Sequence, residues 1–161
     1  MISEKLQEAL NGQIVAEIWS ANLYLSMAFY FDKEGFNGFA NWMKKQSEEE
    51  MAHAFTFASY IIKRGGTAKL GQINAVPQTW ESPLTAFENA YRHECKVSAM
   101  INDLLDLAIK EGDKATQDFL WTFVREQVEE EATASGIVDR LKKMGENAIF
   151  GLDQQYGERK K

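Results

Sequence analysis

The sequence is short of the residues that cross-link a chain or interrupt its helices. It has one cysteine, Cys95, and two prolines, Pro77 and Pro83, in 161 residues. A single cysteine excludes an internal disulfide framework and a zinc site built from several thiolates. Both prolines lie in one central stretch, so neither flanking half contains a proline to break a helix. These absences favour two long helical halves.

A signal peptide, a membrane-length apolar run and an excess of basic residues are also missing. Residues 1–10 lack the basic-then-apolar layout of a signal peptide. No uninterrupted apolar run approaches the ~18–20 residues of a membrane span. The net charge of −6 argues against a nucleic-acid partner and suits the binding of cations. We therefore expect one cytoplasmic domain over residues 1–161, with no membrane or nucleic-acid partner.

Apolar residues recur at steps of three and four in both halves, the period of amphipathic helices. Ser3, Asn37, Ser82 and Asp113 stand where helix N-caps are expected. Residues 157–161 are expected to form a solvated tail. The predicted helices cover residues 4–34, 38–64, 83–111, 114–144 and 148–156.

The segment 66–83 holds glycines and both prolines, shows no clear period, and is too long for a tight turn. A 27-residue helix is about 40 Å long, and 18 extended residues can span about 60 Å. The segment can therefore travel the full length of a bundle. The pattern predicts an all-α fold: a four-helix bundle with one long crossover between helices two and three, plus a short C-terminal fifth helix.

Each long predicted helix has polar residues near its midpoint that interrupt the apolar stripe. Glu50 and His53 are three residues apart, so they lie one above the other on one helix face. A buried carboxylate costs several kcal/mol unless it is paired, and a metal cation is the simplest partner. The interrupting residues are Glu17, then Glu50 and His53, then Glu94, then Gln127 and Glu130.

Hairpin geometry places these six side chains at one depth. The first hairpin folds back near residues 35–36, so Glu17 should face residue 54 or so. The second folds back near residues 112–113, so Glu94 should face residue 131 or so. Four carboxylates and one imidazole suit iron or manganese, and the number of carboxylates favours two ions bridged by a shared carboxylate. The alternative is a buried polar network that holds the helices in register.

In these residues the sequence resembles the bacterial non-haem ferritins over nearly its whole length. Glu17, Glu94 and the runs 49–53 and 126–131 carry the resemblance. The fourth helix has Gln127-x-x-Glu130 where bacterioferritins have Glu-x-x-His, a departure typical of non-haem ferritins that makes the two iron positions unequal.

The resemblance implies a ligand set for iron. Glu17, Glu50 and His53 would hold the first iron, with Glu50 bridging. Glu94 and Glu130 would hold the second, with Gln127 near it. A third iron site would use Glu130 together with three residues that otherwise look like a solvated acidic face: Glu49, Glu126 and Glu129.

The resemblance also implies an activity. Two Fe(II) ions would be oxidised by O2 or hydrogen peroxide, and ferric oxyhydroxide would be stored inside a hollow shell of 24 subunits. Tyr24, on the same stripe as Glu17, would donate a hydrogen bond or an electron; simple core packing is the alternative. Asp113 and Asp118 are candidates for an iron-entry pore, with helix capping and solvated charge as the alternatives.

A haem-binding bacterioferritin is the nearest competing interpretation, because Met51 stands where that family has its haem methionine. The missing second Glu-x-x-His speaks against it, so no haem is expected. A rubrerythrin would need four cysteines, and a DNA-coating miniature ferritin would need a basic tail. A purely structural shell subunit, which stores iron without oxidising it, would have an incomplete set of metal ligands, whereas the set here is complete. His93 points about 100° away from Glu94 on a helix and is not expected to be a ligand.

Overall fold

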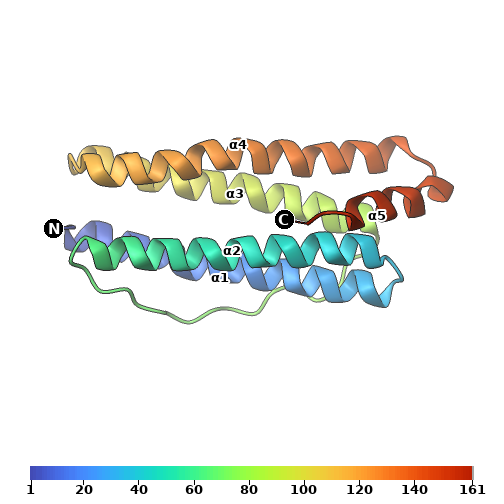
Figure 1. Cartoon of the computed structure of the whole chain (residues 1–161), viewed down its shortest axis with the longest axis horizontal. Helices are drawn as coiled ribbons and strands as arrows, with labels where there is room; N and C mark the ends of the chain where they lie inside the picture. The colour runs from blue at the N-terminus through green and yellow to red at the C-terminus, as the bar shows by residue number, and fades with distance from the viewer. Residues whose placement is uncertain (161) are drawn as a thin grey trace.

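The structure, a computed structural model, describes residues 1–160 and is a bundle of long helices (Figure 1). The described residues contain no strand. The predicted fold class, a four-helix bundle with one long crossover and a short C-terminal helix, is confirmed. The elements are α1 (Glu4–Lys33), α2 (Asn37–Lys63), α3 (Pro83–Lys110), α4 (Lys114–Lys143), the 3-10 turn η1 (Glu146–Ala148) and α5 (Ile149–Gly157).

Three of the four expected N-caps act as caps. The side chains of Ser3, Ser82 and Asp113 each accept a hydrogen bond from the backbone N–H three residues later. Asp113 also forms an ion pair with Arg64 at 3.0 Å, which fits its structural role. Asp118 is exposed on α4.

The prediction that Asn37 caps the second helix is wrong. Asn37 is the first residue of α2, and the N-cap is Phe36, whose side chain makes no capping hydrogen bond. The Phe36 ring stacks on Phe39, with ring centroids 5.7 Å apart. Packing of apolar rings therefore sets the start of this helix. The preceding turn needs a left-handed residue, which Gly35 supplies with φ of 85°.

The crossover, residues 65–82, runs along the outside of the α1–α2 hairpin (Figure 1). Side chains of α1 hold it at several levels. Asn11 donates from Nδ2 to the carbonyl of Thr67 (2.9 Å), and Ser26 donates from Oγ to the carbonyl of Pro77 (2.6 Å). The return along the whole bundle makes α3 parallel to α2 (Figure 1).

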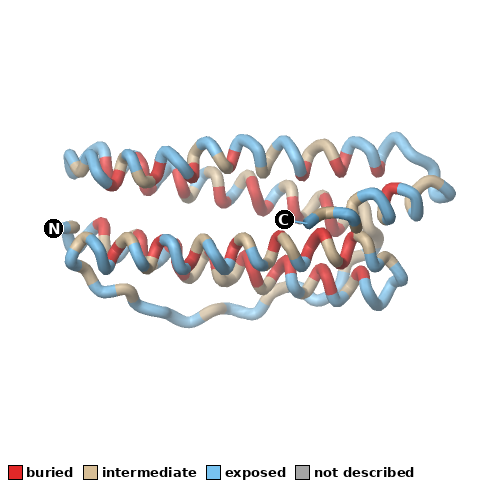
Figure 2. Tube along the Cα trace, in the orientation of Figure 1, coloured by how far each residue is buried: buried red, intermediate tan, exposed pale blue. Residues whose placement is uncertain are grey.

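The inward faces of the four long helices are buried, whereas the crossover is mostly exposed (Figure 2). The apolar core has two clusters. One contains Phe31, Phe39 and Phe87 near the α5 end of the bundle, and the other contains Phe57 and Phe123 in the opposite half. Polar side chains separate the two clusters at the helix midpoints: Glu17, Gln46, Glu50, Glu94 and Gln127 are all buried.

Among residues 1–160, α1 is the one helix long and apolar enough to cross a membrane by length and composition. Half of its apolar 18-residue window is buried inside the bundle. Its buried face carries the polar residues Gln13, Glu17 and Ser20. These are the properties of a core helix.

The C-terminal residues are docked, so the expectation of a solvated tail is wrong for the described part of 157–161. Asn41 donates from Nδ2 to the carbonyls of Gly157 and Arg159, both at 3.1 Å. Asp153 accepts a hydrogen bond from the backbone N–H of Phe39 at 2.7 Å. Lys161 lies outside the described residues.

Docking of α5 needs two glycines where its backbone meets that of α2. A Cβ on Gly38 would lie 1.8 Å from the carbonyl oxygen of Asp153, and a Cβ on Gly157 would lie 2.8 Å from Cα of Gly38. No side chain can move to relieve such a contact, because both neighbours are backbone atoms. The two helices can approach this closely only with glycine at both positions.

Gly38→Ala should therefore destabilise the protein by roughly 1–3 kcal/mol, because the two backbones must separate. Thermal unfolding followed by circular dichroism measures the effect. Gly151→Ala is the matched control in α5, since a Cβ there meets nothing within 4 Å, and its stability should be unchanged or slightly higher. A Gly38→Ala protein as stable as the wild type would contradict the close packing.

Candidate metal centre

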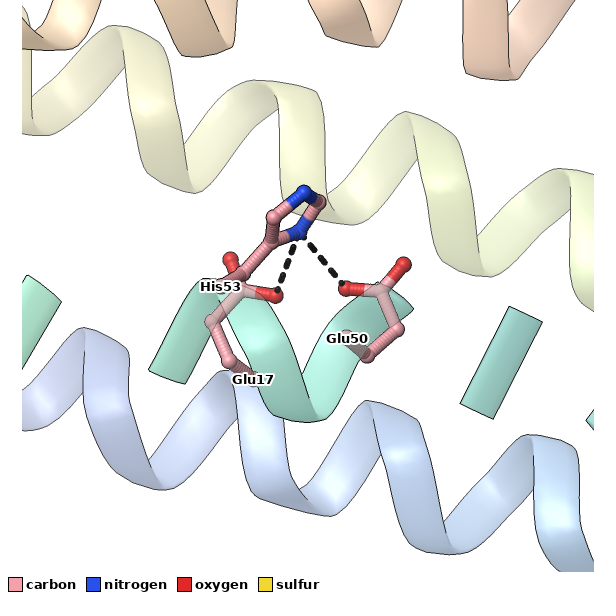
Figure 3. A group of neighbouring side chains, drawn as sticks. All are labelled: Glu17, Glu50 and His53. Atoms are coloured by element: carbon pink, nitrogen blue, oxygen red, sulfur yellow. Dashed lines mark ion pairs between the residues drawn. The ribbon is translucent and has the colours of Figure 1, made fainter. Parts of the chain in front are cut away.

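Three side chains from α1 and α2 meet in the core (Figure 3). One ligand atom from each of Glu17, Glu50 and His53 lies within 4.8 Å of the others. His53 Nδ1 is 3.4 Å from Glu50 Oε2 and 3.7 Å from Glu17 Oε2. Glu17 and Glu50 are 1% and 2% exposed. The three-residue spacing of Glu50 and His53 places both on the face of α2 that looks into the bundle, and Glu17 extends from α1 to meet them there (Figure 3).

The second hairpin contributes Glu94 and Gln127. Glu94 of α3 is buried and accepts a hydrogen bond from the hydroxyl of Tyr24 on α1. Gln127 of α4 donates from Nε2 to Glu94 Oε2 (3.2 Å) and to the Glu94 carbonyl (3.1 Å). Glu94 is therefore held between the two hairpins.

Two further contacts connect α2 with α4. Gln46 donates from Nε2 to Glu130 Oε2 at 2.7 Å and lies 3.4 Å from Glu94 Oε1. His53 Nε2 lies 2.9 Å from Glu126 Oε1. All six predicted interrupting residues thus belong to one polar layer, although Glu94, Gln127 and Glu130 lie outside the three-residue group of Figure 3.

The crowding of carboxylates in this layer shifts their pKa values. Burial raises the pKa of Glu50 well above its usual range, and it also raises that of Glu94 despite the hydrogen bonds from Tyr24 and Gln127. Burial, together with the charge of Glu94, raises the pKa of Glu130 to about 7. These shifts show that the metal-free interior disfavours so many negative charges.

His53 compensates part of this charge. Burial alone would lower its pKa, but contacts with Glu126, Glu17 and Glu50 raise it, which favours the imidazolium. Burial opposes ionisation of Glu17, yet its contact with His53 brings the pKa of that carboxyl below the ordinary value. Burial and the charge of Glu94 raise the pKa of Tyr24, so its hydroxyl remains a donor.

The donor set fits a divalent cation. Glu17 Oε2 is buried and accepts no hydrogen bond within the described residues, and its ionic partner His53 Nδ1 is 3.7 Å away, so a closer cation would stabilise it further. Carboxylate oxygens and one imidazole are ligands that Fe(II) and Mn(II) accept. A bound cation would supply the compensation that the proton on His53 supplies without metal.

The residues predicted for a third iron site lie toward the outside of this layer and share no common partner. The carboxylate of Glu49 forms an ion pair with Arg159 at 3.1 Å, and Glu126 contacts His53. Glu129 is exposed on α4. The structure therefore does not gather these three into one group, and the third site stays a prediction.

Three contacts to the site were missed by the sequence analysis. Gln13 donates from Nε2 to Glu17 Oε1 at 3.1 Å, and Gln46 bonds to Glu130. Both glutamines stand four residues before a glutamate of the layer, a helical spacing that could have indicated them. Arg159 reaches Gln46 and Glu49 from the C-terminal tail, and no local pattern signals it.

His93 and Met51, which the sequence did not predict to be iron ligands, lie outside the group formed by Glu17, Glu50 and His53. His93 is buried, packs on Trp19 with ring centroids 5.2 Å apart, and has Nε2 2.7 Å from Ser20 Oγ. Burial lowers its pKa to about 4, so it stays neutral. Met51 is 36% exposed and lines an apolar hollow with Ile18 and other residues of α1, α2 and the crossover.

Comparison with known proteins identifies the family. The ferritin family, described as a ferritin-like domain, matches residues 7–144. The chain belongs to this family. The resemblance seen in the sequence is therefore confirmed.

Individual ferritins are similar over the whole chain. A bacterial non-heme ferritin of Bacteroides fragilis is 63% identical over 159 residues, covering 99% of this chain and 100% of that protein. One from Staphylococcus aureus is 35% identical over 161 residues, covering 99% and 97%. A solved open-pore ferritin from the archaeon Archaeoglobus fulgidus has a TM-score of 0.98 and 49% identity, covering 99% and 100%.

The raised pKa of Glu130 predicts how the metal-free ferritin responds to pH. Between the ordinary value of 4.5 and about 7, the folded state binds more protons than the unfolded state. The free energy of unfolding should therefore fall as pH rises through this window, by roughly 2 kcal/mol from Glu130. The test compares the thermal midpoints of chelator-treated wild type and Glu130→Gln at pH 5 and pH 7.5.

Glu130→Gln should show a smaller loss of stability across this range than the wild type. Glu129→Gln is the matched control, because Glu129 is exposed one residue away, and it should follow the wild type. Equal pH dependence in Glu130→Gln and the wild type would contradict the assignment of the shift to Glu130.

Proposed function

We propose that this ferritin stores iron and oxidises Fe(II) at the metal centre in its polar layer. One observation carries the proposal: buried carboxylates from three helices converge with His53 between two apolar clusters. Among them, Glu17 Oε2 accepts no hydrogen bond within the described residues. Membership of the ferritin family supports iron as the ion.

In this proposal Fe(II) is the substrate, and two ions bind side by side. Glu17, Glu50 and His53 bind one ion, and Glu94 and Glu130 bind the other. Glu50 reaches both, and Gln127 positions Glu94. The first ion requires His53 to bind as the neutral imidazole, so its binding releases the proton that His53 otherwise holds.

The electron count sets the products. Each Fe(II) gives one electron, so two ions reduce O2 with two protons to hydrogen peroxide, or reduce hydrogen peroxide with two protons to two waters. The chain fixes the spacing of the two ions, and its carboxylates favour the harder Fe(III) product. Tyr24 keeps its proton and holds Glu94 in place; we assign it this positioning role and leave electron donation as the alternative.

The ferric product would be stored as oxyhydroxide inside a hollow shell of 24 copies in the cytoplasm. Exposed apolar side chains on α1, α2 and the crossover support association. Phe29, Phe55 and Leu70 are 62%, 70% and 70% exposed. Phe55 and Leu70 line one apolar hollow, and Phe29 lies at a second one; monomeric proteins rarely leave large apolar surfaces facing water. Glu49, Glu126 and Glu129, together with Glu130, would hold a third iron on its way to the store.

The proposal predicts that His53→Ala and Glu94→Ala each slow the fast phase of Fe(II) oxidation at least about tenfold, because each removes a ligand. Stopped-flow absorbance after mixing Fe(II) with oxygenated protein measures this phase. The wild type should consume two ions per subunit rapidly.

Glu8→Ala, an exposed glutamate of α1, is the control and should keep the wild-type rate. Native mass spectrometry should give 24 copies for every variant, which separates loss of chemistry from loss of assembly. A wild type no faster than free iron would favour a passive shell. Wild-type kinetics in either ligand variant would refute the role given to that residue.

A further inference from the structure

The C-terminal tail brings a positive charge to the rim of the polar layer. After α5 the chain turns back along α2 (Figure 1). The tail is tied to α2 by Asn41, whose amide donates to the carbonyls of Gly157 and Arg159. This docking directs the side chain of Arg159 along α2 toward the acidic residues.

Arg159 makes several contacts that a solvated arginine would lack. Its Nη1 donates to the carbonyl of Trp42 (3.2 Å) and to Gln46 Oε1 (2.9 Å). Its Nη2 lies 3.1 Å from Glu49 Oε2, and its guanidinium sits 4.7 Å from the centre of the Trp42 ring. The side chain is only 16% exposed. These contacts hold the guanidinium in a defined position.

Only the Gln46 side chain lies between the Arg159 guanidinium and two proposed iron ligands, Glu94 and Glu130. Because Gln46 Oε1 accepts from Arg159, its Nε2 must face the other way, where it donates to Glu130 and lies near Glu94. Glu49 is also close enough for its charge to raise the pKa of Glu130. Arg159 therefore stands beside the carboxylate that the third iron would need.

We propose that Arg159 is a resident cation that competes with an additional divalent ion for the Glu49 carboxylate. A guanidinium is always charged, so it cannot leave the site by losing a proton. A divalent ion close to it is repelled, and the rim accepts that ion only when Arg159 withdraws. Docking of the tail and occupancy of the rim by metal then exclude each other. This inference rests on the proposed function, since it presupposes two inner ions.

The test is an anaerobic calorimetric titration of the assembled, metal-free protein with Zn(II), which is redox-silent. Arg159→Gln should bind the ion beyond the first two roughly five- to tenfold more tightly than the wild type. The first two affinities should change less than about twofold, because the variant leaves their ligands in place. Arg159→Lys, which retains the charge, should restore weak binding of the additional ion.

Arg140→Gln is the matched control, because it removes the same charge near the tail. Arg140 donates to the hydroxyl of Tyr156 and has no contact with the acidic rim among its hydrogen bonds in the described residues. It should bind all ions like the wild type, which excludes an effect of net charge. In the wild type, saturation with Zn(II) should also speed hydrogen exchange in residues 157–160, because linkage is reciprocal.

The outcomes separate the two proposals. Suppose that both proteins bind two ions tightly. If wild type and Arg159→Gln then bind the next ion with equal affinity, or if neither binds a further ion, the role of Arg159 is overturned and the metal centre stands. Unchanged exchange of the tail in saturated wild type would also overturn it. Absence of the first two tight ions would overturn the proposed function itself.

Discussion

The structure depends on how a helical bundle accommodates several carboxylates in its interior. Glu17, Glu50 and Glu94 are almost fully buried, and each would have to lose most of its hydration to be charged there. Without metal, the bundle offers three kinds of compensation: the imidazolium of His53, the hydrogen bonds of Gln13, Gln46, Gln127 and Tyr24, and protonation of the carboxyls whose pKa rises. A pair of divalent cations would meet the same need more completely.

The surrounding fold keeps this layer in register. The two apolar clusters lie on either side of it, so sliding one helix along another would move carboxylates into hydrocarbon on both sides. The crossover is pinned to α1 at successive levels, which fixes the direction of α3 relative to α2. The two hairpins are thereby held with Glu17 and Glu50 opposite Glu94. Precise placement of ligands thus follows from ordinary packing of long, rigid elements.

The parts of the fold and site governed by periodicity could be predicted from the sequence. Glu17, Glu50 and His53 were indicated because a polar residue in an apolar stripe has a known face and a known height, and the structure brings these three together. The partners of Glu49 and Glu126 could not be predicted, since they depend on which cation lies nearest in space. Arg159 was missed for the same reason: its place follows from the contact of Gly38 with Gly157, which no local pattern reveals.

Anomalous diffraction from crystals soaked anaerobically in ferrous salt would locate the metal ions in the polar layer. We expect two iron peaks per subunit, about 3–4 Å apart, in the layer between the two apolar clusters. One peak should lie against Glu17, Glu50 and His53, and the other against Glu94 and Glu130. A bundle core with no pair of peaks, or with iron bound only at the surface, would contradict the proposed metal centre.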